Sequence, residues 1–183
     1  MTRVSRPILI VTILCFLLVS LTGCFGLSLR GKRHTVAPAA TAFRALEYAL
    51  SKEKAAYLLG GRGPDVFDCS GLITWSYKQA VGRDAMFRVG SRVTTDAIIN
   101  DLWRFNVVLL PMTDMLPGDV VFITNDHDRV THGGLFVRWI NNDEFEFINA
   151  SSYHGHVVID RWPIGSTQRG QWLVGAGRLK IVY

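Results

Sequence analysis

The sequence predicts an α+β domain in which helices near the N-terminus pack on a central antiparallel sheet of about five strands. One observation is the helical periodicity within residues 38–105, where apolar side chains recur three and four positions apart. The other is a series of short β-branched and aromatic runs, separated by turn residues, from Pro117 onward. Helices that precede the strands, instead of alternating with them, are typical of α+β domains. The length of 183 residues suits one such domain with a short appendage.

Residues 1–23 have the pattern of a lipoprotein signal peptide. Two arginines precede an apolar run over residues 8–21, which is shorter than the roughly 20 residues that a membrane-spanning helix needs. The run leads into Leu21-Thr22-Gly23-Cys24, which resembles a bacterial lipobox. That resemblance implies cleavage before Cys24, lipidation of this cysteine, and a tether to the membrane formed by residues 24–37. The alternative is an uncleaved N-terminal anchor helix.

Such a lipoprotein would lie in the bacterial cell envelope, facing the periplasm. Phe25, in place of an aspartate after the lipidated cysteine, favours the outer membrane if the cell is Gram-negative. The net charge of +5 is modest and, together with export, argues against a nucleic-acid partner. Three cysteines cannot make a disulfide-dense scaffold. After loss of the signal and lipidation of Cys24, Cys69 alone keeps a thiol, so it is either buried and inert or kept for its reactivity.

Three helices are predicted at the start of the domain, which we expect to span residues 38–183. In the first, Phe43 is one of the apolar residues that recur at helical spacing. In the second, Asp68 is a good N-cap and Gly82 a good residue to end the helix. Thr94 or Thr95 is expected to cap the third. The helices are predicted over residues 38–54, 68–81 and 95–105.

Five strands are predicted from Pro117 to the C-terminus. Each is a short run rich in β-branched and aromatic residues, and glycine, proline, asparagine and serine separate one run from the next. Neither internal repeats nor low-complexity tracts interrupt them. The strands are predicted over residues 120–124, 133–140, 144–150, 157–161 and 172–183.

Cys69 is the candidate nucleophile. It follows the predicted N-cap Asp68, so it lies in the first helical turn, where unpaired N–H groups and the helix dipole stabilise an anion. We therefore expect a lowered thiol pKa, which favours the reactive thiolate. Gly71 is expected to leave space for a substrate that approaches the sulfur. The alternative is a buried structural cysteine.

His132 and Asn149 are the candidate partners of Cys69. A nucleophilic thiol needs a base, most often histidine, and His132 opens a predicted strand and is followed by two glycines. Strand alternation places Asn149 on the inward face with Phe145 and Phe147, where an unsatisfied amide costs about 1–3 kcal/mol. An imidazole N–H on the adjacent strand would satisfy it and fix the ring orientation. The alternative is that Asn149 caps a turn.

Four segments resemble the NlpC-type cell-wall cysteine peptidases, a papain-like family. They occur in the family's order between residues 57 and about 160, and Tyr57 and Gly60-Gly61 precede the first of them. The segments are Asp68-Cys69-Ser70-Gly71-Leu72, Leu116-Pro117-Gly118-Asp119-Val120-Val121-Phe122, His132-Gly133-Gly134-Leu135-Phe136 and Phe147-Ile148-Asn149-Ala150-Ser151.

The resemblance implies a papain-like fold with Cys69 as nucleophile, His132 as base and Asn149 as the residue that orients the base. It also implies hydrolysis of amide bonds in peptidoglycan stem peptides, often the D-γ-glutamyl–diamino acid bond, through a thioester and without metal or cofactor. Two positions depart from the family pattern: Asn149, where histidine is common, and Gly133, where a branched residue commonly follows the base. The residues implied to line the substrate cleft are Tyr57, Asp68 and Ser70.

Other classes of function stay open at this point. A metal hydrolase is suggested by His154 and His156, which alternate on one strand, and by Asp126-His127-Asp128, but the sequence has no His-Glu-x-x-His motif and no cysteine pair. A wall-binding lipoprotein that has lost activity would keep the same fold. A related amidase or acyltransferase would keep the same cysteine and histidine.

Overall fold

The computed structural model describes residues 33–82 and 85–182, so the predicted signal peptide and Cys24 lie outside the described residues. The helices are α2 (Ala39–Leu50), α3 (Cys69–Val81), α4 (Ile99–Phe105) and the short 3-10 helix η1 (Met112–Asp114). The strands are β1 (His34–Val36), β2 (Ala56–Tyr57), β3 (Val66–Phe67), β4 (Phe87–Val89), β5 (Arg92–Thr94), β6 (Val107–Leu110), β7 (Val120–Thr124), β8 (His132–Asn141), β9 (Glu144–Ser151), β10 (His156–Pro163), β11 (Thr167–Gln168) and β12 (Gln171–Val182).

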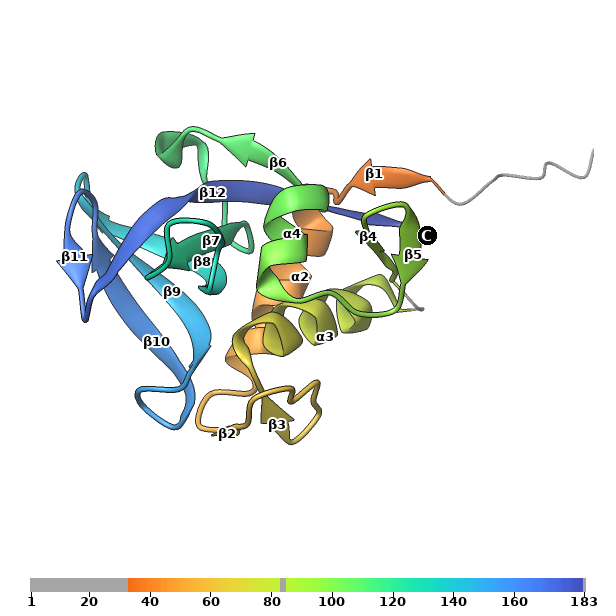
Figure 1. Ribbon diagram of the computed structural model, residues 1–183, viewed down its shortest axis with the longest axis horizontal. Coiled ribbons are helices and arrows are strands. Elements are labelled where there is room, and N and C mark those ends of the chain that lie inside the picture. Colours follow the sequence, from red (N-terminus) through yellow and green to blue (C-terminus); the bar gives the residue numbers. More distant parts are fainter. Residues whose placement is uncertain (1–32, 83–84, 183) are drawn as a thin grey trace, which may run out of the picture. The chain divides into compact units, whose positions relative to one another are not determined.

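The described strands form one ten-stranded sheet and one small hairpin. The large sheet has the order β1-β12-β7-β8-β9-β10-β2-β3, with β6 and β11 also paired to β12, and β4 pairs only with β5. Every pairing is antiparallel except that of β2 with β3. Helices α2, α3 and α4 share one apolar cluster with β7, β8 and β9, so they pack against one face of the large sheet (Figure 1). The fold is α+β, as predicted from the sequence.

The strand count differs from the prediction of about five. The five predicted strands are present as β7, β8, β9, β10 and β12. The additional strands of the large sheet have two to four residues, too few for a clear period of two. Three of them, β1, β2 and β6, also pair with strands far along the chain. Strand β1 is an example, because it pairs with the end of β12 although we placed its residues in the tether.

Two predicted helix boundaries are wrong. The first helix ends at Leu50 and not at Lys54, which adopts a left-handed backbone with φ of 73° in the turn that follows. The third helix begins at Ile99 and not at Thr95. Thr94 ends β5, paired with Phe87, and its hydroxyl donates to the main-chain carbonyl of Asp96 at 2.5 Å instead of capping the helix.

Helix α2 buries small side chains where the sequence suggested an aromatic one. Phe43 is 50% exposed. Because most of the buried residues are alanines, the helix can approach both α3 and the sheet closely. A Cβ on Gly118, in the turn before β7, would lie 2.1 Å from the carbonyl oxygen of Ala42. The buried residues of α2 are Ala42, Ala45, Leu46 and Ala49.

Apolar clusters lie on both faces of the large sheet. Val120 and Phe122 face the helices, whereas Val121 and Ile123 belong to the cluster on the other face, which explains why β7 is apolar throughout. Both faces are thus packed along β7, β8 and β9, which are consecutive in the sheet. No helix within the described ranges is long and apolar enough to cross a membrane.

Candidate active site

Helix α3 presents Cys69 at its first position, as predicted. Asp68 is the N-cap, and its Oδ1 accepts the N–H of Gly71 at 2.7 Å. The helix ends at Gly82, which has the left-handed conformation that glycine favours at this place. The thiol of Cys69 lies against the main-chain N–H groups of Ser70 and of Gly133, the residue after His132. The start of α3 and the start of β8 therefore meet at the sulfur.

A cleft of about 320 Å³ opens at this meeting point. Two hydrophobic side chains, Ile98 and Ile99 at the start of α4, form part of its wall. The other wall residues include polar groups from the loop before β8, the turn before β10 and the start of β12, among them Asn125, Ser152 and Gln171. Five of the residues predicted for the site line this one cleft, namely Tyr57, Asp68, Cys69, Ser70 and His132.

Asn149 lies behind His132, buried and on the strand next to it. Its Oδ1 is 3.0 Å from Nε2 of His132. Its Nδ2 donates to the carbonyl of Val158 at 3.3 Å and to Oδ2 of Asp160 at 3.1 Å. A carbonyl oxygen can only accept, so His132 must carry its proton on Nε2. In the neutral ring the lone pair is then on Nδ1, which has no hydrogen-bond partner among the described residues.

The expectation of an acidic thiol is wrong for this structure. Burial raises the pKa of the Cys69 thiol to about 12, and the negative charge of Asp68 acts in the same direction. Hydrogen bonds from the N–H groups of Ser70, Gly133 and Cys69 itself act in the opposite direction, but they do not outweigh burial. The N–H groups at the helix start do lower the thiol pKa, as expected from the sequence. Loss of solvent around the sulfur raises the pKa by more.

His132 is also neutral in this arrangement. Burial lowers the pKa of its imidazole, while the hydrogen bond to Asn149 and the charge of Asp160 raise it by a smaller amount. No hydrogen bond joins the thiol to the imidazole within the described part of the chain. The site therefore holds a neutral thiol and a neutral imidazole on one cleft, and the imidazole is in the form that can accept a proton.

Glycines around Cys69 are required by packing. A Cβ on Gly71 would lie 1.9 Å from the carbonyl oxygen of Gly61, so this glycine lets the loop before α3 contact the helix. We expected it to leave space for substrate, and that reason is wrong. A Cβ on Gly133 would lie 2.5 Å from the carbonyl oxygen of Val121 on β7, and one on Gly134 would lie 2.3 Å from that of Ile148 on β9. The two glycines after His132 thus permit close approach of strands.

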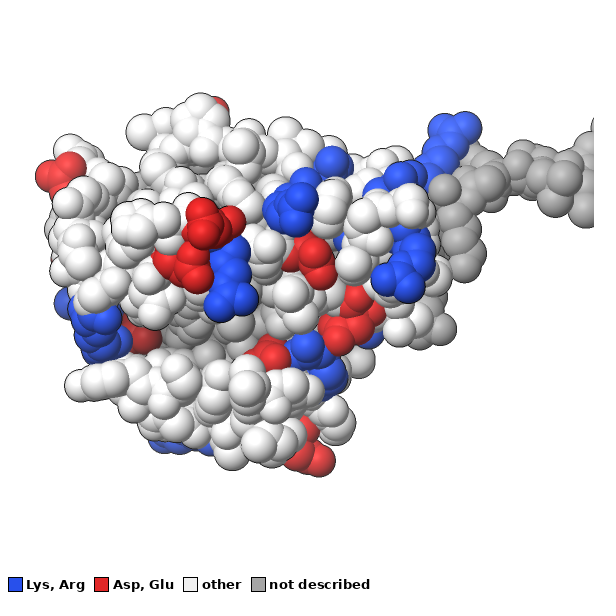
Figure 2. Space-filling view, viewed as in Figure 1, with Lys and Arg blue, Asp and Glu red and all other residues white. Residues whose placement is uncertain are grey.

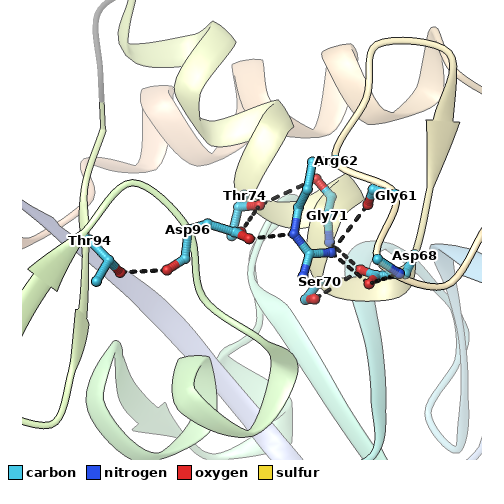
Figure 3. A network of polar contacts seen from close by, with 9 residues as sticks. Gly61, Arg62, Asp68, Ser70, Gly71, Thr74, Thr94 and Asp96 are labelled. Atoms are coloured by element: carbon cyan, nitrogen blue, oxygen red, sulfur yellow. Dashed lines mark hydrogen bonds and ion pairs between the residues drawn. The ribbon is translucent and has the colours of Figure 1, made fainter.

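Arg62 is a residue of the site region that the sequence reasoning missed. Its Nη1 lies 2.6 Å from Oδ2 of Asp68, and its Nε contacts Asp96 (Figure 3). Thr74 on α3 donates to Oδ1 of Asp96 at 3.4 Å and so joins the same network. From the sequence we named Gly60 and Gly61 beside it but gave Arg62 no role. A charged side chain between glycines, six residues before an N-cap aspartate, was the available signal.

The carboxylate of Asp68 has donors on both oxygens. Oδ1 accepts from Gly71 and from the hydroxyl of Ser70 at 2.9 Å, and Oδ2 accepts from Arg62 and from the N–H of Gly60 at 3.0 Å. Burial raises the pKa of Asp68, but the bonds from Arg62, Gly71 and Ser70 outweigh it and hold the pKa below its usual range. Asp68 and Ser70 thus line the cleft, but their polar groups form hydrogen bonds within the protein that stabilise the cleft wall.

Of the three residues predicted to line the substrate cleft, Tyr57 is the one whose polar group is free to bind a substrate. Its hydroxyl has no hydrogen-bond partner among the described residues, and the ring lines the cleft. Burial, followed by the proximity of Cys69 and Asp68, raises the pKa of Tyr57, so the phenol keeps its proton and can donate.

The residues considered for a metal site have other partners. Nε2 of His154 lies 3.2 Å from Oδ1 of Asp160, and Nδ1 of His156 donates to the carbonyl of His154 at 2.8 Å. The ring of His127 packs on Trp172 at 5.2 Å. Residues 33–82 and 85–182 contain no group of three or more His, Cys, Asp and Glu side chains that could hold a metal ion.

The charged side chains on the face drawn in Figure 2 are mixed in sign. On this face, Lys and Arg stand beside Asp and Glu in small groups, and the described residues present no continuous basic area there. The ion pairs among the groups near α3 are those of Arg62 with Asp68 and Asp96. This face therefore has no extended area of positive potential that would attract a polyanion.

Comparisons with known proteins place this site in a family. The model of the NlpC/P60 family matches residues 54–174. Among solved structures, the chain is similar to NlpC1 from Trichomonas vaginalis, with 25% sequence identity and a TM-score of 0.56 over 82% of this chain and 48% of that one. It is also similar to NlpC2 from the same organism, with 24% identity and a TM-score of 0.55 over 79% of this chain and 48% of that one.

A Staphylococcus aureus protein described as similar to a lipoprotein of the NLP/P60 family has 24% identity and a TM-score of 0.52 over 82% of this chain and 45% of that one. The chain thus spans about half the length of these three structures. No curated protein matches the sequence. Because the family model covers more than half of the chain and includes Cys69, His132 and Asn149, the chain belongs to the NlpC/P60 family.

Proposed function

We propose that the protein is a cysteine peptidase that hydrolyses amide bonds in peptidoglycan stem peptides, with Cys69 as nucleophile, His132 as base and Asn149 as orienting residue. One observation carries the proposal. The hydrogen bond from His132 Nε2 to Asn149 Oδ1 leaves Nδ1 as the basic nitrogen, and the ring lines the same cleft as the Cys69 thiol. Membership of the NlpC/P60 family supports the same chemistry.

Acylation of the enzyme begins from neutral groups. Nδ1 of His132 takes the thiol proton as Sγ of Cys69 attacks the scissile carbonyl carbon, so no stable thiolate is required. The oxyanion that forms accepts from main-chain N–H groups at the start of α3, where those of Cys69 and Ser70 already lie against the sulfur. The amide C–N bond then breaks, the imidazolium returns its proton to the leaving amine, and a thioester remains on Cys69.

Hydrolysis of the thioester completes the cycle. Neutral His132 takes a proton from water, and the hydroxide attacks the thioester carbonyl carbon. The C–S bond breaks, the sulfur regains its proton from the imidazolium, and the acyl group leaves as a carboxylic acid. Asn149 keeps the ring in place through both steps, because its own amide is held on the far side by Val158 and Asp160.

The substrate bond that we propose is the one between D-γ-glutamate and a diamino acid of the stem peptide. The resemblance of the Cys69, His132 and Asn149 segments to the NlpC-type peptidases supports this choice. In the cleft, the Tyr57 hydroxyl is the group available to donate to a stem-peptide carbonyl or carboxylate, while Asp68 and Ser70 shape the wall. The alternative is hydrolysis of a related amide or ester bond by the same nucleophile, Cys69, and the same base, His132.

We further propose that Cys24 carries the lipid that holds the protein on the envelope membrane, facing the periplasm. The proposal rests on the Leu-Thr-Gly-Cys sequence that ends the apolar run. Metabolic labelling with palmitate tests it, with Cys24→Ala as the comparison. We expect label in the wild type and none in the variant, which should leave the membrane fraction. Equal labelling of both would contradict the proposal.

Mass analysis of digested cell walls tests the function and names the bond. Purified protein is incubated with peptidoglycan sacculi, and the released fragments are separated and weighed. We expect fragments that end in D-glutamate together with fragments that begin with the diamino acid. Fragments split between muramic acid and L-alanine would assign an amidase instead, and intact sacculi at every enzyme concentration would favour a wall-binding protein.

A further inference from the structure

We propose that Asp160 is a positioning residue, which fixes the tautomer of His132 through Asn149 and supplies the negative charge that an asparagine in the third catalytic position lacks. The inference rests on the proposed function only for its kinetic readout. Asp160 stands on β10, opposite Phe147 of β9 and two residues from Val158, which is opposite Asn149. Its side chain is 19% exposed.

The first step is the orientation of the Asn149 amide. A carboxylate has only acceptors, so Oδ2 of Asp160 at 3.1 Å requires the NH₂ group of Asn149 to face it. The Val158 carbonyl oxygen, 3.3 Å from Nδ2 of Asn149, is also only an acceptor and requires the same orientation. The amide oxygen must then face the other way, toward His132. A serine in place of Asp160 could accept from the NH₂ group or donate to the amide oxygen, and only the longer bond to the Val158 carbonyl would then favour one orientation. The carboxylate therefore supplies the shorter of the two bonds that fix the amide.

The second step is the tautomer of His132. The amide oxygen of Asn149 lies 3.0 Å from Nε2 and can only accept, so the proton of a neutral ring belongs on Nε2. The base is then Nδ1, the nitrogen without a protein partner. With the amide reversed, Nε2 would have to accept, the proton would move to Nδ1, and the ring would offer the cleft a donor in place of a base.

The third step concerns charge. When His132 takes the thiol proton it becomes an imidazolium beside a neutral Asn149. The negative charge of Asp160, one residue farther along the hydrogen-bond chain, favours that cation, and it acts in the same direction on the resting ring. In a Ser-His-Asp triad the carboxylate bonds the imidazole directly. Here the asparagine side chain stands between the two.

Asp160 is itself held in place. Nε2 of His154 lies 3.2 Å from Oδ1, so each carboxylate oxygen has one side-chain donor and the carboxylate does not rotate freely. Titratable and charged groups from several elements line the two cavities beside His132 or contact Asp160 directly. They are Asp68 and Cys69 at the start of α3, Tyr57 on β2, Tyr153 and His154 in the turn before β10, Arg161 on β10, and Arg169 in the turn before β12. Of these, His154 is the one that contacts Asp160.

Two variants of the full chain separate positioning from simple packing. Asp160→Asn keeps the shape and an acceptor but removes the charge, and Asp160→Ala removes both. The matched control is Asp143→Asn, which makes the same chemical change in the exposed β8–β9 turn, at the opposite ends of these strands from His132 and Asn149. The readouts are the ¹⁵N chemical shifts of the His132 ring, assigned with His132→Gln, and the pH profile of kcat/KM on a stem peptide.

We expect Asp160→Ala to show an appreciable Nδ1–H form of His132 and to lose about 10- to 100-fold in kcat/KM, as supporting residues behind a catalytic group commonly do. In Asp160→Asn the acid limb of the profile should move to lower pH, because removal of a negative charge makes the imidazolium less favourable. Asp143→Asn should match the wild type in both readouts.

The proposal is overturned if Asp160→Ala keeps only the Nε2–H form, or if the acid limb of Asp160→Asn stays in place while only the melting temperature falls. Should Asp160→Ala fail to fold, Asp160→Asn still decides through its acid limb. The ¹⁵N chemical shifts of the His132 ring can be measured without any catalytic activity. A protein that cuts no peptidoglycan but changes tautomer with Asp160 would therefore contradict the proposed function and support the positioning role.

Discussion

The guanidinium of Arg62 lies 2.6 Å from the carboxylate of Asp68, the residue directly before Cys69. Asp68 also caps the helix that carries the cysteine, so one carboxylate joins the glycine-rich loop to the start of α3. Arg62 extends the link to Asp96 in the segment before α4 (Figure 3). The wall of the cleft on this side is thus held by charge and hydrogen bonds and not by apolar packing alone.

Arg62→Ala should lower the free energy of unfolding by about 1–2 kcal/mol at neutral pH. A mostly buried Asp68 would lose its cationic partner, but Arg62 is about a third exposed, so solvent screens part of the loss. Urea unfolding measures the effect. The control is Arg129→Ala, which breaks the exposed pair with Asp126 and should leave the transition unchanged. Equal stability of wild type and Arg62→Ala would contradict the bridging role.

The same pair predicts a pH dependence of stability. The pKa of Asp68 is lower in the folded than in the unfolded chain, so its stabilising contribution is present above the unfolded value, about 3.9, and is lost as pH falls through the folded value. The difference in stability between wild type and Arg62→Ala should therefore shrink below about pH 4. Unfolding curves at a series of pH values measure it. A difference that grows on acidification would contradict the assignment.

Gly71→Ala tests two expectations that give opposite signs for the change in the free energy of unfolding. Helix propensity alone predicts that alanine inside α3 stabilises the fold by up to about 1 kcal/mol. The new Cβ would lie 1.9 Å from the Gly61 carbonyl oxygen, so we expect net destabilisation of about 1–3 kcal/mol or more. Gln79→Ala, at an exposed position of the same helix, is the control and should be neutral or slightly stabilising. A more stable Gly71→Ala variant would show that the loop can move away.

Asn149→Ala should impair turnover more than stability. The His132 ring would lose the acceptor that fixes its tautomer, so we expect kcat/KM to fall by about 100-fold or more. The unfolding free energy should fall by about 1–3 kcal/mol, since Asp160 and Val158 lose a donor. Asn142→Ala in the exposed β8–β9 turn is the control. A variant with wild-type kcat/KM and only a lower melting temperature would make Asn149 structural.

Alkylation of Cys69 should be slow at neutral pH and rise steeply in base. With a thiol pKa of about 12, the thiolate fraction grows about tenfold with each pH unit across the range from pH 6 to 10. Peptide mapping after timed exposure to iodoacetamide reports the rate at Cys69 alone. Free cysteine, which levels off near its ordinary pKa, is the reference. A rate at Cys69 that is already constant between pH 6 and 8 would indicate a resting thiolate–imidazolium pair.

The sequence predicted the central strands because each carries its own signal. Strands β7 to β10 and β12 are long, β-rich runs between turn residues, and Asp68 and Gly82 mark both ends of α3. The short strands could not be found in this way, since two to four residues show no clear alternation and β1, β2 and β6 are stabilised by pairing with distant strands. The prediction for Thr94 was wrong because its hydroxyl donates to the carbonyl of Asp96, two residues later, instead of accepting a helix N–H.

The site was predicted in part, for related reasons. Asn149 was found because a polar residue on an apolar strand face needs a partner. Asp160 carries the same signal, because it alternates with Val158 and Trp162 on β10 and is a charged group that needs a partner there. The raised thiol pKa could not be predicted, because burial of the sulfur depends on β8 packing against the start of α3.

The most direct test of the account is the digestion of peptidoglycan by full-length wild type and by Cys69→Ala, with Ser91→Ala as the control at an exposed turn. Released stem-peptide fragments are counted by mass spectrometry, and circular dichroism checks that each protein is folded. We predict fragments from wild type and Ser91→Ala and none above background from a folded Cys69→Ala. Release by Cys69→Ala at the wild-type rate would contradict catalysis by this sulfur.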